Sequence, residues 1–421
     1  MNLYLFLIGS LLLSFSFLIA DPLELSLAGE SVLLMNAESG LILFEKEAHM
    51  LRYPASTTKI ATALYILKLK GEDLNDLIVA EQDCLTILTE EAKKKANYQI
   101  PPYRLEPDGT HISLKTGEQM ALYDLMHGLM IASGNDAANV IAHFLGPTVP
   151  KFMEGMNAYL RSLGCQQTTL YNPHGLHYPQ HQTTAYDLAL MTKEALKNKL
   201  FRQIVSQVRF ARPKTNKQAA TTLLQGNRLL RPGKFYYSKA IGVKTGYHSK
   251  AKNNLVAAAE SQGRLLIAVM MGYRERATMF EEAVKLFETA FNQPKVQRQF
   301  LAQGPQAFTQ LFLEGQTPLK TYLSEPVVLS YYPAEDPKPK CLLYWHALSL
   351  PLLKDQQVGE IHLVSAHGDI LQKVPLLALE EVPLKWFPHI KRLLSSSWLL
   401  WVSISVIVLT TWLLLKRLRR D

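Results

Sequence analysis

A serine followed three residues later by a lysine is the first pattern in this chain that could do chemistry. Ser56 and Lys59 belong to the string Ser56-Thr57-Thr58-Lys59, and the apolar spacing over 56–69 predicts a helix. Residues three apart share one face of a helix, so the amine can reach the hydroxyl. A lysine can activate a serine when burial or a second cation lowers its pKa. The pattern indicates a nucleophile, Ser56, with Lys59 as its base. An isolated Ser-x-x-Lys pattern is, however, also typical of a serine that caps a helix beside an exposed lysine.

A second string, Ser133-Gly134-Asn135, lies between two segments with helical apolar spacing, 122–131 and 136–144. We therefore expect it to occupy a turn between two helices. There Ser133 can relay a proton, and the amide of Asn135 can hold a substrate carbonyl. The same residues also suit a plain turn followed by a capped helix. Both interpretations can hold at once.

The string Lys-Thr-Gly occurs twice, and its surroundings distinguish the copies. Lys115-Thr116-Gly117 precedes the Ser-Gly-Asn turn and is predicted to be a loop. Lys244-Thr245-Gly246 precedes two apolar runs, 254–259 and 265–272, which predict a β-hairpin. Lys244 would then lie on an edge strand, where its cation and the Thr245 hydroxyl can bind a carboxylate. It would also be the second cation near Lys59, so we take the second copy as functional.

In this order the three strings resemble the serine-type D-alanyl-D-alanine carboxypeptidases, the low-molecular-weight penicillin-binding proteins. The likeness runs from about residue 25 to residue 382 and includes Asn172-Pro173-His174-Gly175-Leu176. It implies an oxyanion hole made by the backbone N–H of Ser56 and that of Tyr247 or His248. The implied site residues fall into a catalytic group and a substrate-binding group, namely Ser56, Lys59 and Ser133, and then Asn135, Lys244, Thr245 and Gly246.

The resemblance also implies an α+β fold of the β-lactamase and penicillin-binding type, a helical subdomain plus an antiparallel sheet, over 23–292. A terminal hairpin over 31–44 fits such a sheet. Short apolar runs separated by Pro and Gly predict a small all-β domain over 295–384, acting as a spacer or, alternatively, binding a partner. The stretch 90–111 is longer and more polar than the family pattern, and we expect an inserted loop near the cleft.

Both ends of the chain are apolar. Residues 1–20 carry no charge and predict a signal peptide, with an uncleaved anchor as the alternative. After a linker over 385–397, residues 398–415 form a run of uncharged residues followed by the basic tail 416–421, which predicts a transmembrane helix with a cytoplasmic end. These segments would place the protein in the bacterial inner (cytoplasmic) membrane, with the catalytic domain on the extracytoplasmic side.

Composition argues against other classes. The formal net charge is +9, but the sequence has no basic stripe with interleaved aromatic residues. We therefore do not expect nucleic acid as a partner. The three cysteines are either free or include a Cys84–Cys165 bridge. His174, His177 and His181 have spacings that could mimic zinc ligands, but they lie in turn-rich sequence. We therefore expect no metal and no cofactor.

These inferences predict an enzyme that removes the terminal D-alanine from peptidoglycan stem pentapeptides and is inhibited by β-lactams. The alternatives are a β-lactamase or D,D-endopeptidase and, from another class, a non-turnover penicilloyl sensor or wall-binding protein. A β-lactamase needs a carboxylate that activates water. Between Ser133 and Lys244 the only glutamates are Glu154 and Glu194. We expect both on exposed helix faces, which favours the carboxypeptidase.

Overall fold

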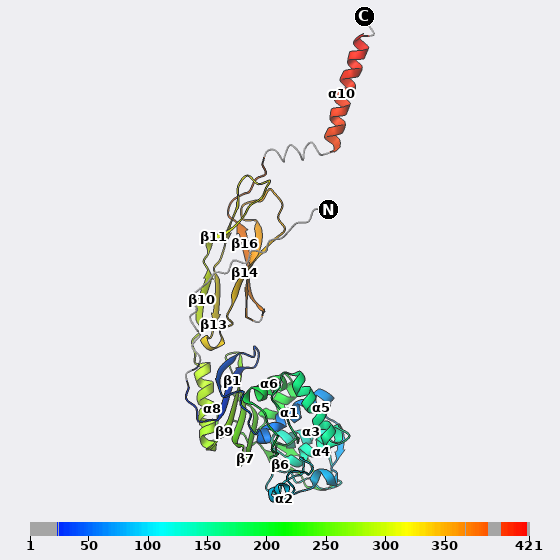
Figure 1. The fold of residues 1–421 in the computed structure, drawn as a ribbon, viewed down its shortest axis with the longest axis vertical. Coiled ribbons are helices and arrows are strands. Elements are labelled where there is room, and N and C mark those ends of the chain that lie inside the picture. The colour runs from blue at the N-terminus through cyan, green and yellow to red at the C-terminus, as the bar shows by residue number, and fades with distance from the viewer. Residues whose placement is uncertain (1–22, 24, 367, 386–396, 419–421) are drawn as a thin grey trace. The chain divides into compact units, whose positions relative to one another are not determined.

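The chain forms two compact units in a computed structural model that describes residues 23, 25–366, 368–385 and 397–418 (Figure 1). The N-terminal unit contains residues 20–294 together with 333–335, and the C-terminal unit contains 295–332 and 336–421. The predicted signal peptide, 1–20, lies outside the described residues. So do most of the predicted linker, 386–396, and the end of the basic tail, 419–421.

A five-stranded antiparallel sheet with the strand order β2-β1-β9-β8-β7 organises the N-terminal unit. The two hairpins predicted from the apolar runs are confirmed as β1–β2 and β8–β9, and the predicted edge position of Lys244 is confirmed in β7. The strands are β1 (Ser31–Asn36), β2 (Ile42–Lys46), β7 (Ala240–His248), β8 (Lys252–Ser261) and β9 (Arg264–Tyr273).

Both faces of this sheet are buried. Alternate side chains of a strand point to opposite sides, so each strand contributes to the core on either face. In β1, Leu33 and Met35 join a core with the helices, whereas Val32 and Leu34 join a second core on the other face. Figure 1 shows α8 (Arg276–Phe291) covering that second face, opposite the helical subdomain. The sheet is thus the middle layer between α8 and the helices that carry the site.

The helical subdomain contains the helices predicted over 122–131 and 136–144, whereas the helix predicted over 56–69 begins two residues later, at Thr58, after a 3₁₀ turn. Its helices are α1 (Thr58–Lys70), α2 (Glu90–Lys95), α3 (Leu122–Met130), α4 (Asn135–Leu145), α5 (Val149–Ser162), α6 (Ala185–Ala195) and α7 (Lys199–Ser206), with 3₁₀ turns at Ala55–Thr57 and Gln82–Leu85. Two small antiparallel pairs join β3 (Leu77–Val79) to β4 (Gln119–Ala121) and β5 (Arg209–Arg212) to β6 (Thr221–Leu224). The first Lys-Thr-Gly copy, at Lys115, lies in an exposed loop before β4, as predicted.

The C-terminal unit contains a five-stranded antiparallel sheet, β11-β12-β16-β15-β14, and the pair β10–β13. Its core is built from aliphatic side chains such as Leu323, Val358, Ile361 and Val374. The strands are β10 (Val296–Leu301), β11 (Gly304–Gln310), β12 (Leu319–Leu323), β13 (Val327–Tyr331), β14 (Lys340–Trp345), β15 (Gln357–Val364) and β16 (Ile370–Ala378), and the 3₁₀ turn Pro333–Glu335 belongs to the N-terminal unit.

The last described element is the helix α10 (Ser397–Leu418). Its described side chains, among them Trp401 and Trp412, are exposed. When only the described residues are searched, no helix is long and apolar enough to cross a membrane. The transmembrane segment predicted for 398–415 therefore stays a prediction.

The cysteines are free thiols in the structure. Cys84 and Cys165 are buried, and Cys341 is half-buried. Burial raises the pKa of Cys84 and of Cys165 to about 12, so neither thiol is a reactive thiolate near neutral pH. Of the two alternatives left open by the sequence, free thiols and a Cys84–Cys165 bridge, the structure has the free thiols.

Candidate active site

Ser56 lies in the 3₁₀ turn Ala55–Thr57 that leads into α1. The backbone just before it is strained, with φ of +48° at Ala55. Asn254, buried on β8, holds this turn: its Nδ2 donates to the carbonyl oxygens of Tyr53 at 2.8 Å and of Pro54 at 3.0 Å. Strained backbone at a functional residue persists where surrounding contacts fix it, and the asparagine supplies those contacts.

Lys59 follows Ser56 by one helical turn and is fully buried. Its Nζ lies 3.0 Å from Oγ of Ser56, 2.6 Å from Oδ1 of Asn135 and 2.7 Å from the carbonyl oxygen of His174. Three separate segments therefore meet at one amine. The structure places the two residues of the Ser-x-x-Lys string in contact, as their spacing predicts.

Electrostatics favour the neutral form of this amine. The pKa of Lys59 is lowered well below its usual value, first by burial and then by the charge of Lys244, while Asp136 acts in the opposite direction. Lys244 is itself buried on β7, and burial followed by the charge of Arg276 lowers its pKa to about 7. Because the two lysines repel one another, charging one favours neutrality of the other.

The Ser-Gly-Asn string forms the turn between α3 and α4. Ser133 has φ of +62° and lines the cleft, and Asn135 begins α4 with its side chain buried. Asp136 secures the turn, since its carboxylate accepts the backbone N–H groups of Ile112 and Leu114, each at 3.0 Å. Within the described part of the chain, the Ser133 hydroxyl makes no hydrogen bond, which leaves it available to a ligand.

The Lys-Thr-Gly strand passes directly against the nucleophile turn. A Cβ added at Gly246 would lie 2.9 Å from the carbonyl oxygen of Pro54 and 2.9 Å from the backbone nitrogen of Ser56, closer than real Cβ atoms approach other atoms. A glycine is therefore required for this approach. Thr245 and Gly246 line the same cleft as Ser56. All seven residues predicted from the sequence thus lie at or directly beneath one cleft.

The loop after Asn172 supplies contacts that the sequence did not reveal. Nδ1 of His174 accepts the N–H of Leu176 at 3.1 Å, so the ring proton lies on Nε2, 3.2 Å from the carbonyl oxygen of Tyr103. Burial, and then the charge of Lys59, lowers the pKa of His174 well below its usual value, which keeps the ring neutral. The hydrogen bond from Lys59 is accepted by the backbone carbonyl of His174, so the residue type at this position does not predict it.

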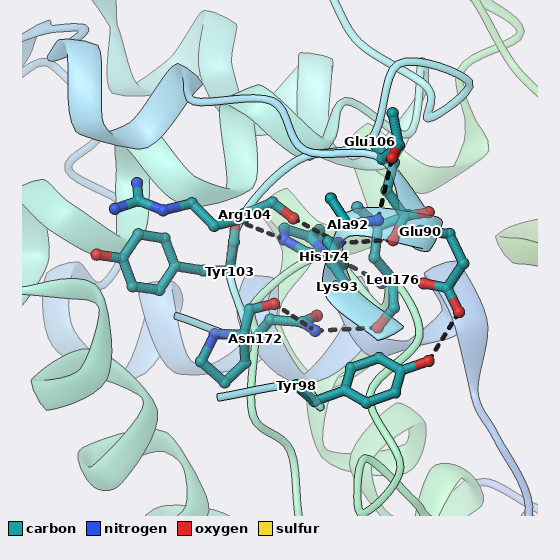
Figure 2. Close-up of polar contacts among 12 residues, drawn as sticks. Glu90, Ala92, Lys93, Tyr98, Tyr103, Arg104, Glu106, Asn172, His174 and Leu176 are labelled. Carbon is teal, nitrogen blue, oxygen red and sulfur yellow. Dashed lines mark hydrogen bonds and ion pairs between the residues drawn. The ribbon is translucent and has the colours of Figure 1, made fainter. Parts of the chain in front are cut away.

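The stretch 90–111 packs beside this loop, as Figure 2 shows. Nζ of Lys93 lies 2.6 Å from Oε1 of Glu106 and donates to the carbonyl oxygen of Arg104 at 2.8 Å. Both partners are largely buried, and burial raises the pKa of Glu106. The same stretch reaches the site directly, since the N–H of Asn135 donates to the carbonyl of Thr110 at 2.8 Å. The predicted loop near the cleft is therefore a folded, internally paired segment.

The cleft has a volume of about 600 Å³. The carboxylates that line it differ from those considered in the sequence. Glu154 is exposed and pairs with Lys151 at 2.7 Å, as expected, but Glu194 is half-buried rather than exposed and pairs with Lys197 at 2.6 Å. Neither lines the cleft. Three carboxylates that do, Glu90, Glu106 and Asp108, lie in 90–111, outside the Ser133–Lys244 interval on which the sequence argument rested.

The three histidines with zinc-like spacing have structural partners. Nδ1 of His181 accepts the N–H of Tyr171 at 3.0 Å, and its Nε2 lies 2.9 Å from Oγ1 of Thr58. Nε2 of His177 lies 2.9 Å from Nζ of Lys250. Across the described residues, no three His, Cys, Asp or Glu side chains gather so as to hold a metal ion.

Comparison with known proteins identifies the family of this chain. The profile of the D-alanyl-D-alanine carboxypeptidase family matches residues 19–275. The chain is 28% identical to the D-alanyl-D-alanine carboxypeptidase DacF of Bacillus subtilis, covering 85% of this chain and 87% of that protein. It is 29% identical to the D-alanyl-D-alanine carboxypeptidase DacA of Escherichia coli, covering 84% of this chain and 83% of that protein.

Solved structures show the same fold. Penicillin binding protein 5 from Haemophilus influenzae is 24% identical with a TM-score of 0.58, covering 86% of this chain and all of that one. A Streptomyces DD-transpeptidase is 26% identical with a TM-score of 0.55, covering 64% of this chain and 98% of that one. The fold is therefore that of the penicillin-binding serine peptidases, as the sequence predicted. The chain belongs to the D-alanyl-D-alanine carboxypeptidase family.

Proposed function

We propose that this chain removes the terminal D-alanine from peptidoglycan stem pentapeptides through an acyl-enzyme formed on Ser56. The observation that carries the proposal is the buried amine of Lys59, whose Nζ lies 3.0 Å from Oγ of Ser56 and whose pKa is lowered well below its usual value. A neutral amine can accept the serine proton as the hydroxyl attacks, whereas an ammonium cannot.

The contacts of Lys59 fit such a base. A neutral lysine has two N–H donors and one lone pair. Asn135 and His174 take the two donors, so the lone pair is directed at the Ser56 hydroxyl. The side-chain NH₂ of Asn135 is then left to bind a substrate carbonyl. Lys244, when charged, keeps Lys59 neutral and, with Thr245, binds the terminal carboxylate of the peptide.

The two half-reactions then use the same groups. In the first, Oγ of Ser56 attacks the carbonyl of the penultimate D-alanine while its proton moves to Lys59. The proton passes by way of Ser133 to the leaving amine, and free D-alanine departs. In the second, water attacks the ester and gives a proton to Lys59, which passes it to Oγ of Ser56 as the C–O bond breaks; the shortened peptide leaves as a carboxylic acid and Ser56 is regenerated. The backbone N–H of Ser56 supports the oxyanion in both steps, with a second donor at Tyr247 or His248; each such donor contributes roughly 3–4 kcal/mol.

β-Lactams should acylate the same serine and remain bound. Of the cleft carboxylates, Glu106 is paired with Lys93, and Oε1 of Glu90 accepts the Tyr98 hydroxyl at 2.8 Å. Among the described residues Oε2 of Glu90 is buried without a hydrogen-bond partner, and Asp108 is exposed. The expectation of slow penicilloyl hydrolysis therefore rests on the pairing of Glu106 with Lys93 and on the Tyr98 hydroxyl that holds Glu90.

The direct test is to measure D-alanine release from a stem pentapeptide and penicillin hydrolysis with the same enzyme. We expect D-alanine release with turnover, no release by Ser56→Ala, and a penicilloyl adduct that outlasts one peptide turnover many times over. Multiple-turnover hydrolysis of penicillin without D-alanine release would indicate a β-lactamase. Stoichiometric acylation with neither activity would indicate a sensor, and cleavage of crosslinked dimers alone an endopeptidase.

We further propose that the enzyme acts outside the cytoplasm, exported by the signal peptide 1–20 and held by a transmembrane helix over 398–415. Eighteen uncharged residues followed by Lys416, Arg417, Arg419 and Arg420 support this topology. The small β domain, predicted over 295–384, would be a spacer between membrane and catalytic domain. An alkaline wash should leave the protein in the membrane fraction, and a reporter fused after Asp421 should be cytoplasmic. Release at high pH would contradict the span.

A further inference from the structure

Three leucines are strongly exposed at one end of the C-terminal unit. Leu311 and Leu313 lie in the connection from β11 to β12 and are 82% and 96% exposed, and Leu353, in the connection from β14 to β15, is 65% exposed. We call these residues the leucine tip. Large apolar side chains gathered on a surface mark an interaction site more often than isolated ones do.

The leucine tip lies where the described chain leaves the unit. The N–H of Lys385 donates to the carbonyl of Glu314 at 2.8 Å, and its Nζ donates to the carbonyl of Leu313 at 2.9 Å. Leu352, next to Leu353, pairs with Val382 in an isolated bridge. Both connections of the leucine tip are thus bonded to the segment that ends at Lys385.

The sequence after this point is typical of a membrane interface. Trp386 and Phe387 follow Lys385, Lys391 and Arg392 come next, and the apolar stretch 398–415 begins soon after. Thirteen residue steps separate Lys385 from residue 398, so even a fully extended chain reaches only about 45 Å. A helix anchored at 398–415 would therefore keep Lys385, which is bonded to the leucine tip, within about 45 Å of the start of that helix, a distance from which the tip can reach the lipid surface.

We propose that the leucine tip docks on the lipid bilayer, with Leu311, Leu313 and Leu353 entering the boundary between head groups and acyl chains. The proposal rests on the membrane anchor proposed above. The charges beside the tip balance, Lys354 and Lys385 against Glu314 and Asp355. Because the contact is apolar rather than electrostatic, it should persist at high salt and on zwitterionic lipid. Docking would fix the orientation of the C-terminal unit on the membrane rather than leave it on a free tether.

The chain offers a matched control at the opposite end of the same sheet. Ile370 and Leu371 begin β16 and are 52% and 38% exposed. Ile370 pairs with Val364, whereas the end of β16 that is paired with Gln357 adjoins the leucine tip. A label at Ile370 therefore reports on a similar exposed apolar position at the far end of the strands.

The experiment uses the full chain in phosphatidylcholine vesicles that carry a quencher on the acyl chains. In a Cys341→Ser background, where the remaining native thiols are buried, either Leu313→Cys or Ile370→Cys is labelled with an environment-sensitive dye. We expect a blue shift and strong quenching at Leu313→Cys, little change at Ile370→Cys, and the same result in 0.5 M salt. Equal responses at the two sites would overturn the proposal.

Two further readings separate the possible failures. If the full chain does not float with the vesicles, the anchor itself is wrong, and the docking proposal falls with it. If the chain floats but the label at Leu313→Cys stays in water, the anchor stands and docking is wrong. A label shielded equally in detergent, together with a dimer on gel filtration, would show that a second copy covers the tip and would also overturn it. Unchanged penicillin labelling checks that each variant is folded.

Discussion

Nζ of Lys59 lies 2.6 Å from Oδ1 of Asn135, closer than the 3.0 Å that separates it from Oγ of Ser56. The oxygen of the amide is therefore committed to the base, and its NH₂ group remains for the substrate. The asparagine thus orients the lysine, and in the proposed mechanism its NH₂ group binds the peptide.

This pairing predicts different effects of two substitutions at Asn135. Asn135→Asp places a negative charge beside Lys59, which raises the pKa of the amine and protonates the base. Asn135→Ala removes an acceptor but adds no charge. We expect Asn135→Asp to slow penicillin acylation by roughly 10²–10⁴-fold at pH 7, and more than Asn135→Ala does. The activity of Asn135→Asp should recover partly as the pH rises. Equal, pH-independent losses would show that the amide has no influence on the protonation of Lys59.

The ion pair of Lys93 and Glu106 should hold the segment 90–111 against the site. Removing one partner of a buried pair leaves an uncompensated charge, which typically costs about 3–5 kcal/mol. We expect Glu106→Gln to increase hydrogen exchange in this segment and to lower kcat/KM for the pentapeptide, whereas the double variant Lys93→Met/Glu106→Leu should recover most of the loss.

The exposed pair Lys151–Glu154 provides the matched control. Its partners are separated by 2.7 Å but are more than half exposed. Exposed pairs contribute about 0–1 kcal/mol. Glu154→Gln should therefore change neither exchange nor kcat/KM. If Glu106→Gln were equally silent, the inserted segment would not support the site.

The pH dependence should follow Lys244. Its pKa is about 7 in the free enzyme, and carboxylate binding needs its charged form. As the pH rises through 7 the charge is lost, so kcat/KM for the peptide should fall on the alkaline side, mainly through KM. Arginine keeps its charge to much higher pH, so in Lys244→Arg the alkaline fall of kcat/KM should occur at a higher pH.

The first Lys-Thr-Gly copy supplies the control for that measurement. Lys115 lies in an exposed loop, so Lys115→Ala should leave the profile unchanged. A larger loss in Lys115→Ala than in Lys244→Ala would mean that the other copy is functional.

The sequence predicted the parts of the site that depend on local spacing. Ser56 lies in the 3₁₀ turn that leads directly into the helix of Lys59, and Lys244 lies on the strand before the predicted hairpin, so each required only one local pattern to be recognised. The contacts of Asn254 and His174 were not predicted, because they join residues far apart in the sequence: Asn254 binds the backbone of the nucleophile turn, and His174 binds Lys59 through its own carbonyl. Such contacts depend on how segments pack, which no short pattern encodes.

The burial of Lys93 within a charged stretch could not be predicted from the sequence either. Three consecutive lysines predict a solvated surface, yet Lys93 is only 3% exposed because Glu106 lies opposite it. The hairpins were predictable, since short continuous apolar runs bounded by turn residues are typical of strands buried on both faces. The packing of 90–111 against the cleft was not, because turn-rich polar sequence is compatible with many conformations.

The most direct test of the central claim is intact mass spectrometry after incubation with penicillin, with the modified peptide mapped. The account predicts one adduct, on Ser56, with the intact mass of penicillin added because the ring opens without losing atoms. It also predicts no adduct in Ser56→Ala whose circular dichroism is unchanged, and slow labelling in a Lys59 variant. An adduct that persists in folded Ser56→Ala, or that maps to another serine, would contradict the assignment of Ser56 as the nucleophile.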